Sequence, residues 1–112
     1  MSEKRLDLYI YKGNSFSKTE TWSSETDLSE DYSAIMHIKY SVYEEDPIVL
    51  LSSENGISLG RDGSITISMT PEQTNKFEEY SAVYDMKVIK NDGTMFTTFW
   101  GSVKIMPQIT KL

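Results

Sequence analysis

The feature that most constrains this chain is a long alternation of apolar and polar residues in its last third, between Tyr80 and Pro107. From Ser81 to Lys90, and again from Met95 to Ile105, apolar residues recur at about every second position, as in strands with one buried face. Asp92-Gly93 lies between the two runs, and glycine supplies the positive φ that a short hairpin turn needs. We therefore predict a β-hairpin against which the other strands are placed.

The alternation assigns a face to each hairpin residue. The inner face of the first strand is predicted to hold Ala82, Tyr84, Met86 and Val88, and that of the second Phe99, Val103 and Ile105. The opposite face of the second strand is expected to hold Thr98, Trp100, Ser102 and Lys104.

Short β-type runs separated by turn residues fill the rest of the chain: Leu6–Tyr11, Ser15–Trp22, Tyr32–Tyr40, Ile48–Leu51, Ile57–Leu59 and Ser64–Met69. Trp22 is expected to fill part of the core, with its indole N–H bonded to a carbonyl. The run Ile48–Leu51 is apolar without alternation, so we expect a strand that is buried on both faces or leads around an edge.

One helix signal interrupts these strands. Thr70 and Gln73 have the spacing of a capping box, and Pro71 suits the first helical position. These residues predict a short helix over about residues 71–78.

The element pattern predicts a single domain over residues 1–112: an all-β, immunoglobulin-like antiparallel β-sandwich of seven or eight strands with one short helix. An up-and-down barrel or a jelly roll fits less well, because the strands are uneven and the chain is short. In immunoglobulin domains a tyrosine stands two residues before the second cysteine; here Met86 would replace that cysteine. Tyr84 is then either a corner tyrosine bonded to upstream backbone or a plain core aromatic.

Composition narrows the function. The formal net charge is −6 and the pI about 4.7, which argues against nucleic-acid binding. The chain has no cysteine and a single histidine, His37, which is expected to face solvent, so we expect neither a metal site nor a cofactor nor an enzyme. We see neither a membrane span nor a signal peptide. The acidic clusters at 27–31 and 44–46 are interpreted as a solvated surface.

Aromatic residues at outward positions are the feature that a plain sandwich does not need. Tyr9, Tyr11 and Trp100 fall opposite the predicted inner faces, as do Val83 and Ile89. If these strands are neighbours, the residues form an apolar patch of the kind that marks protein contacts; otherwise they pack under a loop or terminus. With the apolar residues of the C-terminal segment, the candidate contact residues are Tyr9, Tyr11, Trp100, Ile109 and Leu112.

Several stretches, in order along nearly the whole chain, resemble small virion proteins of tailed phages, and in particular the N-terminal immunoglobulin-like domain of lactococcal phage baseplate upper proteins. The matching stretches are Leu8–Phe16, Asp27–Ala34, Met36–Lys39, Gly56–Leu59, Asp62–Ile67, Tyr84–Met86 and Gly101–Pro107. The chain differs from this family at Gln108, where glutamate is frequent, and it ends five residues after Pro107. We therefore expect a stand-alone subunit that carries no receptor-binding head.

The resemblance implies a non-enzymatic structural protein of the tail, baseplate or head, assembled in the host cytoplasm and located in the virion. Its partners would be other virion proteins and further copies of itself in a symmetric assembly. Two alternatives remain: a carbohydrate-binding β-sandwich that stacks sugars on exposed Tyr and Trp, or a small acidic phage protein that binds a host factor.

Overall fold

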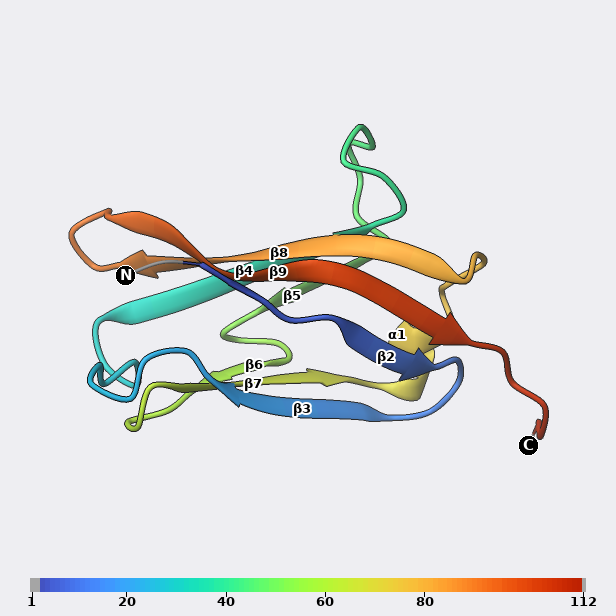
Figure 1. The fold of residues 1–112 in the computed structure, drawn as a ribbon, viewed down its shortest axis with the longest axis horizontal. Helices are drawn as coiled ribbons and strands as arrows, with labels where there is room; N and C mark the ends of the chain where they lie inside the picture. Colours follow the sequence, from blue (N-terminus) through green and yellow to red (C-terminus); the bar gives the residue numbers. More distant parts are fainter. Residues whose placement is uncertain (1–2, 112) are drawn as a thin grey trace.

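The computed structural model describes residues 3–111, which form two facing β-sheets (Figure 1). The elements in this range are β1 (Lys4–Arg5), β2 (Leu8–Tyr11), β3 (Phe16–Thr21), β4 (Tyr32–Lys39), β5 (Val49–Ser52), β6 (Ile57–Leu59), β7 (Ser64–Met69), α1 (Pro71–Thr74), β8 (Ser81–Lys90) and β9 (Met95–Met106). The prediction of an all-β sandwich is confirmed.

The strand order is that of an immunoglobulin domain. The large sheet runs β1-β9-β8-β4-β5, with β2 also paired to β9, and the small sheet runs β3-β7-β6. Lettered along the chain from β2 as A, with β5 as C′ and β9 as G, the sheets read A-G-F-C-C′ and B-E-D. Two details differ from the prediction: β1 and β2 pair with β9 in parallel, and the expected Leu6–Tyr11 strand is divided in two.

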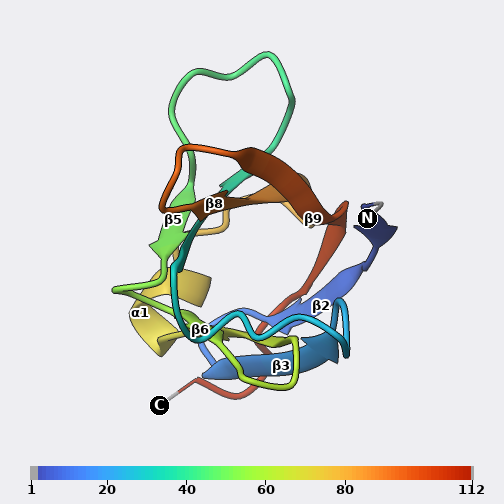
Figure 2. The ribbon, with the colours of Figure 1, turned by 90° about the vertical axis from the view of Figure 1, so that its left-hand side faces the viewer.

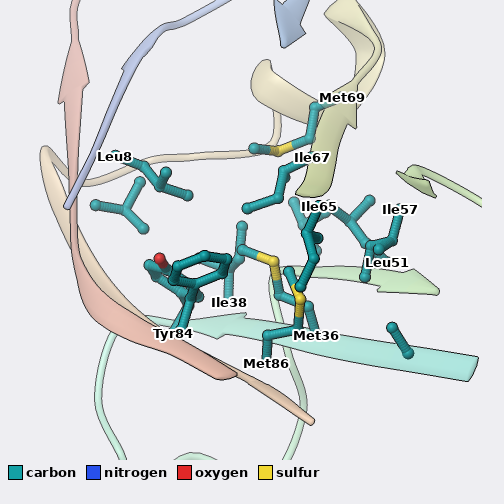
Figure 3. Close-up of a cluster of buried hydrophobic side chains, with 14 of the residues drawn as sticks. Leu8, Met36, Ile38, Leu51, Ile57, Ile65, Ile67, Met69, Tyr84 and Met86 are labelled. Carbon is teal, nitrogen blue, oxygen red and sulfur yellow. The ribbon is translucent and has the colours of Figure 1, made fainter. Parts of the chain in front are cut away.

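The core lies between the sheets and contains no disulfide. Met36 of β4 and Met86 of β8 are cross-strand neighbours, and both are fully buried. They face Ile65 and Ile67 of β7 across the sandwich (Figure 3). Burying side chains of this size stabilises a fold by about 1.5–3 kcal/mol each. Met86 therefore occupies the position of the missing cysteine as a packing residue.

The long hairpin contains a β-bulge that the alternation did not predict. Asp85 pairs with Trp100 and Lys87 with Thr97, so Met86 lies opposite two residues, Thr98 and Phe99. An extra residue of this kind resets the period-two pattern on the bulged strand. The prediction that Thr98 faces outward was therefore wrong: it is 0% exposed, next to Phe99 at 1%.

The structure decides two other local predictions. Of the two alternatives for the run Ile48–Leu51, the edge position is the one observed: β5 (Val49–Ser52) is an edge strand, and Leu50 is 45% exposed. Trp22 is buried as predicted and stacks on Phe96 at a centroid distance of 5.1 Å. The predicted hydrogen bond to a carbonyl is wrong, because the indole N–H is buried without a hydrogen-bond partner among residues 3–111.

The helix α1 has the predicted start but ends four residues early. Thr70 and Gln73 form both hydrogen bonds of the capping box, and Pro71 is the first residue. The Thr74 hydroxyl accepts from Gly13 N and donates to Asn14 O, which fixes α1 to the β2–β3 turn. Phe77 is buried at 1% exposure, so the chain turns into the core where the prediction continued the helix to residue 78. No helix within 3–111 has the length and apolar character needed to cross a membrane.

The small sheet has an edge strand, β3, with charged residues at inward positions. Lys18 pairs with Ile67 and Glu20 pairs with Ile65, and both isoleucines are core residues. Lys18 is exposed and Glu20 half-buried, so neither charge enters the core.

Two glycines with positive φ test how tightly the turns are packed. Gly63 (φ 77°) and Gly93 (φ 93°) both occupy the left-handed region, but a Cβ at Gly63 would lie 1.6 Å from Ser23 O, whereas a Cβ at Gly93 meets no atom within 4 Å. We expect Gly93→Ala to cost about 1–2 kcal/mol of unfolding free energy, from the backbone conformation alone. Gly63→Ala should cost more, because the Ser23 backbone must move. Urea unfolding of both variants checks this; equal losses would contradict it.

Candidate functional site

The outer face of the large sheet carries the candidate site. Register places Tyr9 beside Lys104, Val83 beside Ser102, and Lys39 beside Val83, all on the side away from the core. Figure 2 shows the sheets as two layers, with the segment between β4 and β5 rising beyond the large sheet. One side of the face is therefore bounded by a projecting loop.

A cross-strand row runs through the middle of this face. Leu50 pairs with His37, His37 with Asp85, Asp85 with Trp100, and Trp100 with Arg5. Cross-strand neighbours lie about 4.5–5.5 Å apart at Cβ, so the five side chains form one continuous line over five strands. The Arg5 guanidinium lies 5.1 Å from the centroid of the Trp100 ring, which is cation–π geometry.

A hollow of about 510 Å³ lies over this row. The side chains that give it its chemical character are Arg5, His37, Lys39, Val42, Val83, Asp85 and Trp100. Polar and charged groups thus surround an aromatic ring. Val42 comes from the projecting loop and the others from the strands.

The projecting loop, residues 41–47, contains hydrogen bonds at its base. Glu44 Oε1 accepts from Tyr40 N at 2.7 Å and from Ser41 N at 3.1 Å. Ser41 O in turn accepts from Glu44 N at 3.2 Å. Val42 and Tyr43 at its tip are 72% and 92% exposed.

The N-terminal segment is fixed to the face at the edge of the row. Asp7 Oδ1 accepts from Ser102 N at 3.0 Å and from Arg5 Nε at 3.1 Å. A Cβ at Gly101 would meet Leu6 O at 2.6 Å, so the close crossing of this segment over β9 requires glycine there. The Tyr84 hydroxyl donates to Leu6 O at 2.5 Å. Tyr84 is thus both a core aromatic and bonded to upstream backbone, although its acceptor belongs to the N-terminal segment.

The contact residues predicted from the sequence lie in separate places on the molecule. Tyr9 (62% exposed) and Tyr11 (59%) lie together on β2, while Trp100 (40%) lies in the central row. Trp100 is four residues from Lys104, the partner of Tyr9, which is about 13 Å along the strand, so the tyrosines and Trp100 share a face without touching. Ile109 is 95% exposed, beyond β9. Leu112 lies outside the described residues.

Sequence reasoning missed part of this face. Arg5, Val42, Tyr43, Leu50 and Met95 lie on it or beside it, and none was a candidate. Leu50 was overlooked because the run Ile48–Leu51 gives no alternation, and Val42 and Tyr43 because their segment resembles a solvated acidic loop. The sequence predicts an apolar outer patch if the strands that carry these outward residues are neighbours, and β2, β9 and β8 are neighbouring strands.

The outer face of the small sheet has a different composition. Its outward positions are all serine or threonine: Ser17, Thr19, Thr21, Ser58, Ser64, Thr66 and Ser68. Thr19 and Thr66 share a hydroxyl–hydroxyl hydrogen bond of 2.8 Å. The two outer faces of the sandwich are therefore chemically distinct, one hydroxyl-rich and the other rich in apolar and cationic groups.

Within residues 3–111 no three His, Asp or Glu side chains gather in a way that could hold a metal ion.

Comparison of the chain with protein-family models gives no match, and comparison with the curated proteins gives none either.

Tyr84→Phe tests the attachment of the N-terminal segment. The variant keeps the buried ring and removes the hydroxyl that donates to Leu6 O. We expect a loss of about 1 kcal/mol in unfolding free energy, and faster amide exchange in β1 and β2. Tyr9→Phe, at an exposed position, is the control and should change neither. Unchanged exchange in β1 and β2 would contradict the proposed attachment.

Asp7→Asn tests the same attachment through pH. The hydrogen bond from Ser102 N, aided by Arg5, lowers the pKa of Asp7 below its ordinary value of 3.8. Ionised Asp7 therefore contributes stability above pH 3.8, and this is lost as pH falls through the lower folded-state pKa. We expect the variant to be less stable than the parent at neutral pH, with a difference that narrows below pH 3.8. Chemical unfolding over a pH series measures this difference in unfolding free energy, with Asp46→Asn as the control. A difference between parent and Asp7→Asn that stays constant with pH would refute the prediction.

Proposed function

We propose that this chain is a non-enzymatic structural protein of a tailed-phage particle, in the tail, baseplate or head. It would act by docking to other particle proteins and to further copies of itself. The ordered resemblance along the chain supports the particle role, and the outer face of the large sheet supports the docking mechanism.

The observation that carries the proposal is the distribution of exposed apolar groups. Nine large hydrophobic side chains are exposed among residues 3–111, and seven lie on the outer face of the large sheet or in loop 41–47 beside it: Tyr9, Tyr11, Val42, Tyr43, Leu50, Met95 and Trp100. Apolar groups gathered on one face mark protein contacts more often than the same groups scattered singly. The hydroxyl-rich small sheet would then face solvent.

Aromatic side chains and arginine are enriched among the residues that dominate binding energy. Trp100 is the fourth of the five side chains in the cross-strand row, between Asp85 and Arg5, and the Arg5 guanidinium stacks on its ring. Tyr9 and Tyr11 extend the contact area along β2. A partner that covers this face would bury all of them together with the hollow.

Carbohydrate binding is the second candidate, and the hollow is the observation that favours it. It places the Trp100 ring beside Asp85 and His37, a combination that could stack and hydrogen-bond a sugar. Arg5 covers one side of the indole, which leaves at most one side for stacking. Binding on a glycan array that Trp100→Ala abolishes would support this alternative over docking.

The docking proposal predicts that the tagged chain assembles into particles in infected cells, and that mass spectrometry of purified virions finds it. Trp100→Ala should weaken binding to the partner about thirtyfold or more, because central aromatic anchors typically contribute about 2 kcal/mol or more. Ser17→Ala, on the hydroxyl-rich face, is the control and should bind normally. Purified virions that lack the protein would overturn the particle role.

A further inference from the structure

The charge on the outer face of the large sheet is opposite to that of the whole protein. The chain has 17 acidic and 11 basic residues. Among the described outward side chains of its strands, however, four are cations (Arg5, Lys39, Lys87 and Lys104) and one is an acid (Asp85). A second acid, Asp7, lies between β1 and β2 and pairs with Arg5. A cationic and apolar face on an acidic protein selects a partner whose matching surface is negative.

The protein carries such a surface itself, in the projecting loop. Residues 41–47 contain Glu44, Glu45 and Asp46 and no lysine or arginine, together with the exposed apolar side chains of Val42 and Tyr43. The loop rises past the plane of the outer face, at the β4–β5 edge of the sheet (Figures 1 and 2). The backbone of this acidic loop therefore lies where a molecule covering this face would meet it.

Strand register places the loop level with Lys104 of the opposite edge. The loop follows Lys39, which pairs with Val83, and Val83 pairs with Ser102 of β9. Two residues further along β9, Lys104 pairs with Tyr9 of β2. Loop 41–47 and the pair Lys104–Tyr9 thus lie at about the same height along the strands, on opposite sides of the sheet.

A two-fold rotation about an axis parallel to the strands keeps each residue at the same height along the strands and exchanges the two edges of the sheet. Two copies stacked face to face about such an axis would each place loop 41–47 over the partner copy's β9–β2 edge, near Lys104. An in-plane axis perpendicular to the strands would instead place each loop over the β4–β5 edge of the other copy, at the opposite end of the strands and away from its Lys104. The charge pattern therefore selects one of the two symmetric arrangements.

We propose that the outer face of the large sheet binds a second copy of this chain in a two-fold dimer, with loop 41–47 of each copy over Lys104 of the other. The inference rests on the docking role proposed above and names its first partner. The molecule extends 43 Å along its longest axis and 22 Å along its shortest, which run along and across the strands of this sheet. A face of this size can supply the roughly 800 Å² per partner of a standard interface.

The test reverses charges at the proposed contact. Dimerisation of the full chain is then measured by sedimentation velocity over a series of protein concentrations and salt concentrations. The parent should dimerise, and more weakly at high salt. Lys104→Glu and Glu45→Lys, both at exposed positions, should each raise the dimer Kd about tenfold or more, because each opposes like charges at two symmetric contacts. An equimolar mixture of the two variants, and the chain with both changes, should regain dimers. Lys18→Glu, on the small sheet, is the control.

A parent chain that stays monomeric at every concentration overturns the inference. So does a dimer that neither Lys104→Glu nor Glu45→Lys weakens, and so does a mixture of the two that fails to pair, even if an acidic partner protein is then found on this face. Circular dichroism establishes that each variant is folded. A chain that is monomeric in solution but present in virions would leave the particle role standing, whereas a charge-dependent dimer absent from virions would overturn that role alone.

Discussion

Packing between the two sheets is the interaction on which the rest of the structure depends. No disulfide joins the sheets, because the chain has no cysteine. Met36 and Met86 fill the centre of the interface from neighbouring strands of the large sheet, against isoleucines of β7. Methionine is flexible and fills irregular gaps, so it can replace a bridge in space although it adds no covalent constraint. The sandwich is therefore held together by close packing, and the bulge opposite Met86 belongs to that packing.

The N-terminal segment completes the outer face and is attached by a small number of specific contacts. Tyr84 bonds its backbone from within the core, Asp7 bonds the β9 backbone from outside, and Gly101 leaves space for the crossing. These contacts divide the segment into β1 and β2, so that Arg5 reaches Trp100 while Tyr9 and Tyr11 lie further along the sheet. The stability of the fold and the composition of the candidate interface therefore depend on the same few residues.

Local patterns in the sequence were sufficient to predict the sandwich, the capping box at Thr70 and the outward positions of Tyr9, Tyr11 and Trp100. They failed where long-range contacts override the period of two. Thr98 is buried because a bulge adds a residue to β9, and the helix ends at Thr74 because Phe77 belongs to the core. The hollow and the charge pattern of the outer face could not be predicted, because they depend on which strands are neighbours and in which register.

The charges at inward positions of β3 have a consequence for contacts between molecules. An edge strand presents unpaired backbone groups to which strands of other molecules can add, and such addition leads to aggregation. Lys18 and Glu20 stand where an added strand would need apolar neighbours. The β3 edge of the small sheet is thereby guarded against the addition of a strand from another molecule.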